Sequence, residues 1–408
     1  MKDNRRSYKD FTRKRKMPFT SLIIFMMNAV KQTLQKELTN FMEIIYNKRE
    51  NITKSAFCQS RMKLKPEAFV ELNDVLVHEF YTDNDELRWK GFRLIAIDGS
   101  LIQLPNSEEI ISNFGCLKNQ FGDGMPSARI STCYDILNEI VIDTQINNCK
   151  VHEYDLALEH LEKLKQKDLF IYDRNYGGIW FMYKHHVGNR DFVIRMKRTS
   201  IKEIDSFFES KEKEKTLKIN KLSEKSKKRL KELGIEFKPF EIRIVKVILD
   251  NGEVEVLATS LTNKEKYPTE ILKDLYFKRW GVETNYDHLK NNLQLEDFTG
   301  LSFISVKQDL FASMFIINLQ SIIIDDLKEE LKNKKSKKDY MYKINRNLSL
   351  GFMKDRVVSL FFDKTKDTFE ELRELFKMEL VPVRPNRKNE RVEKLSRRKF
   401  HMNKKRAI

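Results

Sequence analysis

The segment spanning residues 275–290 (LYFKRWGVETNYDHLK) constrains this chain of 408 residues more than any other stretch. Four of its polar side chains follow one another at positions i, i+3, i+7 and i+14, namely Tyr276, Arg279, Glu283 and Lys290. At about 100° of turn per residue, these positions fall within a sector of roughly 60°. The segment is therefore predicted to be one helix that carries a carboxylate, two cations and a phenol on a single face, with Trp280 beside them.

Two apolar runs elsewhere in the chain each lead into an aspartate. Residues 92–97 (FRLIAI) are predicted to form a buried strand ending at Asp98, and residues 168–172 (DLFIY) a second one followed by Asp173. A central strand fixes the backbone of such an aspartate while its side chain reaches the open edge of the sheet. The plain alternative is an aspartate that caps the turn after a strand. Asp287, one turn beyond Glu283, is the strongest rival for a third acid.

Asp98, Asp173 and Glu283 together suit the chemistry of phosphodiester cleavage. A two-metal route needs carboxylates that hold two divalent ions about 3.5–4 Å apart. Mg²⁺ is the expected metal, with Mn²⁺ as a substitute, because hard oxygen ligands favour it and no soft ligands are offered. Asp135 and Asp143, on the predicted hairpin of residues 128–146, are expected to be solvated.

The charge balance favours a polyanionic partner. Lys and Arg number 77 against 60 Asp and Glu, a net charge of +17, and each phosphate neutralised by a cation releases counterions. Biased composition is the alternative, since many lysines in residues 211–231 fall on solvated helix faces. The four cysteines show no metal-ligand spacing, and the apolar stretches at 22–27 and 311–324 are too short or too interrupted to span a membrane. The expected location is the cytoplasm.

The order of the predicted elements gives an α/β fold with three parts. Residues 1–88 are predicted to be a helical, DNA-binding N-terminal domain. Residues 89–330 hold hairpin strands followed by alternating helices and strands, a mixed sheet with flanking helices and a β-strand-rich insertion at about 199–263. Residues 331–408 are a helical C-terminal region with a basic tail.

Two short helices near the start form a candidate DNA reader. Thr53 is predicted to cap the first, KSAFCQSRMKL, and Pro66 fits the first turn of the second. Lys54, Arg61 and Lys63 are expected to be exposed on this helix-turn-helix-like unit and to contact DNA. A plain helical bundle explains the same periodicity.

These motifs together resemble the DDE transposases of insertion-sequence family four, which share the Tyr-Arg-Glu-Lys pattern. The resemblance covers most of the chain, including AIDGS, the hairpin SARISTCYDILNEIVID, LFIYDRNYGG, the helix YFKRWGVETNYDHLK and QDLFASMFIINL. One departure is Asn175, where the family often has a small residue. Asn tolerates left-handed backbone geometry, so the turn is expected to be kept.

The resemblance implies a ribonuclease-H-like fold, with Asp98, Asp173 and Glu283 as the catalytic, metal-holding acids. It further implies that Tyr276, Arg279 and Lys290 grip phosphates near the cleaved end, and that Trp280 stands where the family often has an aromatic. The implied activity is cut-and-paste transposition: binding of terminal inverted repeats in double-stranded DNA, cleavage, and strand transfer within a homodimeric synaptic complex. A catalytically silent DNA-binding derivative and a structure-selective nuclease of the same fold are the alternative hypotheses.

Overall fold

A computed structural model describes residues 3–28, 32–46, 52–83, 86–118, 124–164, 167–249, 252–331, 340–362 and 367–384. The helices are α1 (Phe19–Met27), α2 (Leu34–Tyr46), α3 (Lys54–Arg61), α4 (Glu67–Asp83), α5 (Glu108–Phe114), α6 (Glu153–Lys163), α7 (Ile179–Val187), α8 (Lys202–Glu209), α9 (Glu224–Glu232), α10 (Thr269–Phe277), α11 (Trp280–Asp287), α12 (Phe303–Leu331), α13 (Arg346–Phe362) and α14 (Thr368–Met378). Short turns η1 (Arg174–Tyr176) and η2 (His288–Asn292), the latter a π-helix, follow β5 and α11.

The strands of the main sheet are β1 (Arg93–Gln103), β2 (Cys116–Lys118), β3 (Gly124–Asp135), β4 (Ile140–Asn148), β5 (Asp168–Tyr172), β6 (Asp191–Arg195), β7 (Glu214–Ile219), β8 (Phe240–Ile248) and β9 (Val254–Thr259). A small ribbon pairs β10 (Tyr342–Ile344) with β11 (Leu380–Pro382).

The main sheet has the strand order of a ribonuclease-H-like fold. Strands β4, β3 and β1 form an antiparallel meander, and β5 and then β6 continue it parallel to β1. The apolar runs of β1 and β5 are buried on both faces, as expected of central strands with a parallel neighbour. The mixed α/β class predicted from the sequence is therefore confirmed.

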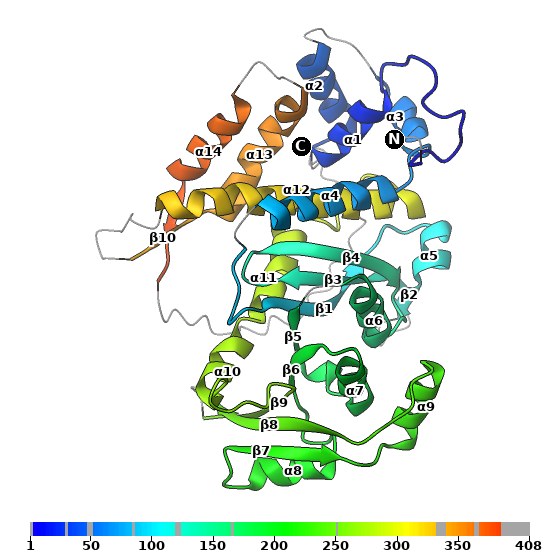
Figure 1. The fold of residues 1–408 in the computed structure, drawn as a ribbon. Helices are drawn as coiled ribbons and strands as arrows, with labels where there is room; N and C mark the ends of the chain where they lie inside the picture. Colours follow the sequence, from blue (N-terminus) through cyan, green and yellow to red (C-terminus); the bar gives the residue numbers. More distant parts are fainter. Residues whose placement is uncertain are drawn as a thin grey trace.

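The region predicted as a strand-rich insertion extends this sheet. Strand β9 pairs antiparallel with β6, and β8 and β7 follow it outward. The region also contains α8 and α9, and it lies at the lower end of the molecule in Figure 1. Strands β1, β5 and β6 and the strands of the insertion therefore belong to one continuous hydrogen-bonded sheet.

Helices cover both faces of the sheet. On one side, α12 and α4 run across β4 and β3, with α1–α3, α13 and α14 stacked beyond them, and α6 and α7 cover the other side (Figure 1). Among the described residues, α12 alone is long and apolar enough to cross a membrane, yet 72% of its most apolar window is buried inside the protein. A buried core helix passes that test equally well.

Candidate active site

Asp98 on β1 and Asp173, the residue directly after β5, occupy neighbouring positions at the edge of the sheet. The parallel register pairs Ala96 with Ile171, so two residues further on Asp98 stands next to Asp173 and points to the same face. Adjacent strands run about 4.8 Å apart. The apolar runs predicted both acids at one edge of the sheet, and the pairing of β1 with β5 places them there.

The prediction that the first strand ends at Asp98 is wrong. Strand β1 continues to Gln103, because its antiparallel pairing with β3 extends from Ile95 to Gln103. What ends near Asp98 is the pairing with β5, since that partner strand stops at Tyr172. Asp98 therefore lies in the middle of β1. Its backbone is paired with β3 on one side, and on the other side the pairing with β5 has already ended.

Burial and the neighbouring charge make Asp98 an unusual carboxyl group. Desolvation, followed by the repulsion of Asp173, raises its pKa to about 7, although Oδ1 accepts a hydrogen bond of 2.9 Å from the Gly99 amide. Asp173 caps the turn after β5 by accepting from the Asn175 amide at 2.8 Å. The turn is kept, but Asn175 does not have a positive φ, so the left-handed geometry expected there is not needed.

The backbone of Asp98 is held from two sides. Its carbonyl oxygen accepts a hydrogen bond of 2.7 Å from the Tyr286 hydroxyl on α11 and a longer one of 3.4 Å from Ser131 on β3. Ser131 in turn contacts the buried His160 at 3.0 Å, whose other ring nitrogen lies 2.6 Å from Asp143. This network ties α6 and α11 to the strand that carries the first acid.

Asp135 and Asp143 are consequently not solvated, and that expectation is wrong. Asp135 is fully buried and accepts from the Tyr81 hydroxyl and the Asn138 side chain, each at 2.7 Å. Asp143 is paired with His160 and Lys163. The alternation that placed both residues on an outer face did not account for α4 and α6, which cover the hairpin.

The predicted single helix over 275–290 is divided in the structure. α10 ends at Phe277, α11 begins at Trp280, and residues 288–292 form the π-helix η2. The extra residue in the π turn changes the phase of Lys290 relative to the motif's earlier members. Lys290 nevertheless reaches the acids' strand, donating to the Ser100 hydroxyl at 2.7 Å and to the Leu101 carbonyl at 2.8 Å.

Glu283 is held by an arginine of its own motif. Arg279 Nη2 donates to Glu283 Oε1 at 2.7 Å. The positive charge of the same guanidinium also acts to lower the pKa of Asp98. No three acidic, histidine or cysteine side chains of the described residues are grouped closely enough to hold a metal ion. We call Asp98, Asp173 and Glu283 the acid centre: the two aspartates are neighbours, and the charges of both Glu283 and Asp98 act on Arg279.

Two donors next to the acid centre lack acceptors. Among the described residues, the Tyr276 hydroxyl and Arg279 Nε have no hydrogen-bond partner, and both residues are buried, with only 6% of their surface exposed. Leaving such donors unpaired costs about 1–3 kcal/mol each. An anionic ligand with oxygen acceptors would satisfy both.

The other motif residues differ in exposure. Trp280 is 47% exposed and stacks beside Arg279, whose guanidinium carbon is 5.4 Å from its ring centre. Asp287, the rival third acid, is exposed and accepts a hydrogen bond from Asn291. Glu283 is the better placed of the two, because its partner Arg279 is close enough to the aspartates to lower the pKa of Asp98.

A fourth acid, Glu153, lies near Asp98 and was not predicted from the sequence. It begins α6, pairs with Arg129, and lies so close to Gly99 that a Cβ there would be 2.9 Å from Glu153 Cγ. Its charge adds to the effects that raise the pKa of Asp98. An acid in the first turn of a predicted helix is the common sequence signature of a favourable helix dipole, which gave no reason to place it at this site.

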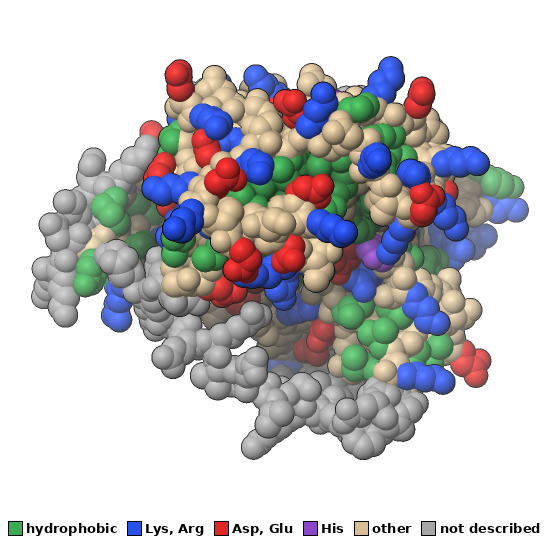
Figure 2. All heavy atoms as spheres, turned by 90° about the horizontal axis from the view of Figure 1, so that it is seen from below, with side chains coloured by type: hydrophobic (Ala, Val, Ile, Leu, Met, Phe, Trp, Pro, Cys, Tyr) green, Lys and Arg blue, Asp and Glu red, His purple; other side chains and the backbone are tan. Residues whose placement is uncertain are grey.

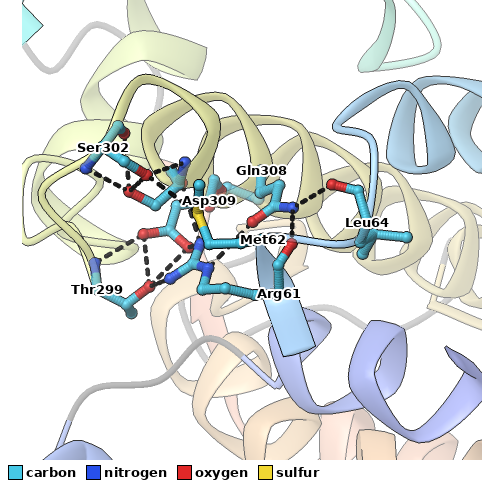
Figure 3. A network of polar contacts seen from close by, with 9 residues as sticks. Arg61, Met62, Leu64, Thr299, Ser302, Gln308 and Asp309 are labelled. Carbon is cyan, nitrogen blue, oxygen red and sulfur yellow. Dashed lines mark hydrogen bonds and ion pairs between the residues drawn. The ribbon is translucent and has the colours of Figure 1, made fainter. Parts of the chain in front are cut away.

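Of the three predicted N-terminal DNA contacts, Arg61 is contradicted by the structure. Its side chain is 2% exposed and donates to Gln308, Thr299, Asp309 and the Ser305 carbonyl (Figure 3). Gln308 returns hydrogen bonds of 2.9 and 2.8 Å to the carbonyls of Arg61 and Leu64. Arg61 therefore joins α3 to α12 and cannot reach a nucleic acid.

Lys54 is exposed and Lys63 is half-buried, and their contact with DNA stays a prediction. Thr53 caps α3 as predicted, accepting from the Ala56 amide at 3.2 Å.

The chain is similar to several known proteins. The sequence model of the family described as "Transposase DDE domain" matches residues 89–319. A curated relative, the transposase InsG for insertion sequence element IS4 of Escherichia coli strain K12, is 23% identical over 335 residues, which cover 78% of this chain and 73% of that protein. A solved structure, the piggyBac transposase synaptic complex with hairpin DNA, matches 92% of this chain and 78% of its own, with a TM-score of 0.46 and 11% identity.

Proposed function

Because the chain belongs to the Transposase DDE domain family and is a DNA transposase, we propose that it moves its own element by a cut-and-paste route. It would bind the terminal inverted repeats, cleave the phosphodiester bonds at the ends by hydrolysis, and join the freed 3′-hydroxyls to target DNA. Asp98, Asp173 and Glu283 are the proposed catalytic residues.

The adjacency of Asp98 and Asp173 is the observation that carries this proposal. Two carboxylates forced together, with the pKa of one raised by burial and by the other, form a pair of hard oxygen donors that fits a divalent cation. Bound there, Mg²⁺ or Mn²⁺ would lower the pKa of the attacking hydroxyl and compensate the charge on the leaving oxygen. The chain's part is to hold the donors rigidly, through the strand pairing and the Tyr286–Asp98 hydrogen bond.

The unpaired donors support a phosphate contact. The Tyr276 hydroxyl and Arg279 Nε would donate to oxygens of a DNA phosphate. Lys290 would give up its hydrogen bonds to Ser100 and Leu101 and bind a second phosphate instead. Turning Arg279 onto a phosphate would also release Glu283 from its ion pair. DNA binding would thereby complete the acid centre as a metal site.

The remaining elements of the proposal concern assembly. Synapsis of two ends requires at least a dimer of this chain, and its place of action would be the cytoplasm, at the chromosome. Lys54 and Lys63 are proposed to add contacts to the end sequence from the N-terminal helices.

The test uses the purified full chain and a duplex containing the DNA that borders the coding region. With Mg²⁺, we expect nicking at the element's boundary. Asp98→Asn, Asp173→Asn and Glu283→Gln should each abolish it while leaving binding largely intact, and Asp287→Asn should still cut. End binding without any nicking would support a silent derivative, and cutting independent of the boundary sequence a structure-selective nuclease.

The exchange at Arg279 is tested by Mn²⁺ binding followed by electron paramagnetic resonance. Arg279→Ala should bind Mn²⁺ more tightly than wild type without DNA, because Glu283 is freed. Lys278→Ala, which removes an exposed neighbouring cation, is the matched control. Equal affinities in the two variants would refute the exchange.

A further inference from the structure

Helix α9, in the insertion, is attached to the start of α6, whose first residue Glu153 helps to raise the pKa of Asp98. Arg229 pairs with Asp155 on α6, two residues after Glu153, and its guanidinium carbon lies 5.3 Å from the ring centre of Trp180 on α7. Ser226 and Leu230 are the buried residues of α9. The helix is therefore held in place beside the start of α6, and it is not a free solvated arm.

The two flanks of α9 are not equivalent. At about 100° per residue, Lys225 lies on the flank of Arg229, and Lys227 and Lys231 lie on the opposite flank. Lys228 points outward between Lys225 and Lys231, about 60° from each. The pKa of His152, just before α6, is lowered by partial burial and by the positive charges of Lys225, Arg129 and Arg229. Lys225 therefore faces the side of α9 that borders α6 and the acid centre.

Lys225 and its outward-facing neighbour Lys228 are available to a ligand. Lys225 and Lys228 are exposed, and neither forms an ion pair with another part of the chain that the structure describes. Lys227, on the far flank, is neutralised by Glu224 at 2.6 Å. Seen from the insertion's end of the molecule, Lys and Arg side chains predominate toward the right-hand side, where α9 lies in Figure 1 (Figure 2).

Cations from two parts of the chain therefore lie near the acid centre. Arg279 and Lys290 approach it from α11 and η2, and Arg129, Lys225 and Arg229 surround its border at α6. A DNA strand carries one phosphate per about 3.4 Å of helix axis. A strand with one phosphate at the acid centre therefore brings further phosphates to the surfaces beside it.

We propose that the exposed surface of α9 formed by the i, i+3 neighbours Lys225 and Lys228 binds the phosphate backbone of double-stranded DNA next to the cleaved bond. This inference rests on the proposed function and adds to it a second contact surface, on a different element from Arg279 and Lys290. The insertion then takes part in DNA binding through a helix that Arg229 anchors, and the contact is to the backbone, independent of base sequence.

The experiment compares two matched double variants, Lys225→Ala with Lys228→Ala and Lys227→Ala with Lys231→Ala. Both remove two positive charges from one helix. Affinity for a fluorescein-labelled duplex of random sequence is measured by anisotropy over a range of salt concentrations, without divalent ions. We expect the first variant to bind roughly tenfold more weakly, with a salt slope lower by about one for each lost contact, and the second to resemble wild type.

Three results would overturn the proposal: no change in either variant, equal losses in both, or a larger loss on the far flank. Equal losses would mean that only net charge matters. Circular dichroism of both variants checks that α9 is intact, and a benzophenone side chain introduced at position 225 or 227 gives an independent readout, with crosslinking to the duplex expected only from 225. If wild type binds no DNA, the proposed function itself fails; if wild type binds and cuts while the α9 variants are unaffected, this inference alone fails.

Discussion

At the scale of single residues, Asp98 combines two demands that oppose each other. The sheet must bury it to fix its position, yet a metal ligand must be ionised. Burial and Asp173 raise its pKa from 3.8 to about 7, so in the folded protein without metal Asp98 holds a proton that the unfolded chain has already released. The cost of ionising it appears as lost stability.

The expected pH dependence follows from this difference. Since the folded state binds the extra proton, the free energy of unfolding should fall as pH rises from about 4 through about 7. The pKa difference corresponds to at most about 4 kcal/mol. Asp98→Asn should therefore stabilise the metal-free protein at about pH 8 and have little effect at about pH 4, as measured by urea unfolding. Equal effects at both pH values would show that Asp98 titrates normally.

Residue patterns predicted the acids better than the basic contacts. Asp98 and Asp173 each follow a short apolar run rich in residues that favour central strands, so the sequence predicted that both would lie at one edge of the sheet. Arg61 carried no comparable signal. In a helix of eight residues, an arginine on the inner face looks like any surface arginine, because its partners Gln308 and Asp309 are about 250 positions away.

At the scale of elements, the polar network around Arg61 decides how α3 meets α12. The guanidinium of Arg61 donates hydrogen bonds to the side chains of Gln308, Thr299 and Asp309 and to the Ser305 carbonyl (Figure 3). The side chains of Arg61 and Asp309 are 2% and 15% exposed. A pair so buried is costly to break, because the remaining charge loses its partner.

Arg61→Ala is therefore expected to lower the free energy of unfolding by about 3 kcal/mol. Lys54→Ala, an exposed change in the same helix, should alter it by less than about 0.5 kcal/mol. Chemical denaturation of both variants measures the difference. If Arg61→Ala left stability unchanged and weakened DNA binding instead, the buried role assigned here would be wrong and the earlier expectation of a DNA contact would return.

Elements were also where the sequence was least informative. The helical spacing over 275–290 correctly predicted helical structure. It did not predict the break at Lys278–Arg279 or the π turn at 288–292, because neither changes the amphipathic pattern. Both deviations come from tertiary demands. Tyr286 must reach the Asp98 carbonyl and Lys290 must reach Ser100 on the same strand, and a regular helix has one fixed angle between these positions.

At the scale of the whole molecule, one hydrophobic cluster joins parts that are far apart in the sequence. It includes Phe25 and Phe41 from the N-terminal helices, Ile130 from the sheet, Phe315 from α12 and Phe376 from α14. The insertion shares the sheet itself, through the pairing of β6 with β9. The predicted boundaries at residues 88 and 330 divide the chain by composition, whereas this core crosses both.

A chain that begins at residue 89 should for this reason not fold by itself. Removing residues 1–88 takes α1 and α4 away from α12 and leaves Gln308 and Asp309 without Arg61. Exposed apolar surface of that kind leads to aggregation. Size-exclusion chromatography and thermal unfolding should show aggregates or no cooperative transition, and co-expression with residues 1–88 should restore a soluble complex. A monomeric, cooperatively unfolding fragment 89–408 would instead establish residues 1–88 as a separate domain, and α12 would then have to be stable with its α4 face open to water.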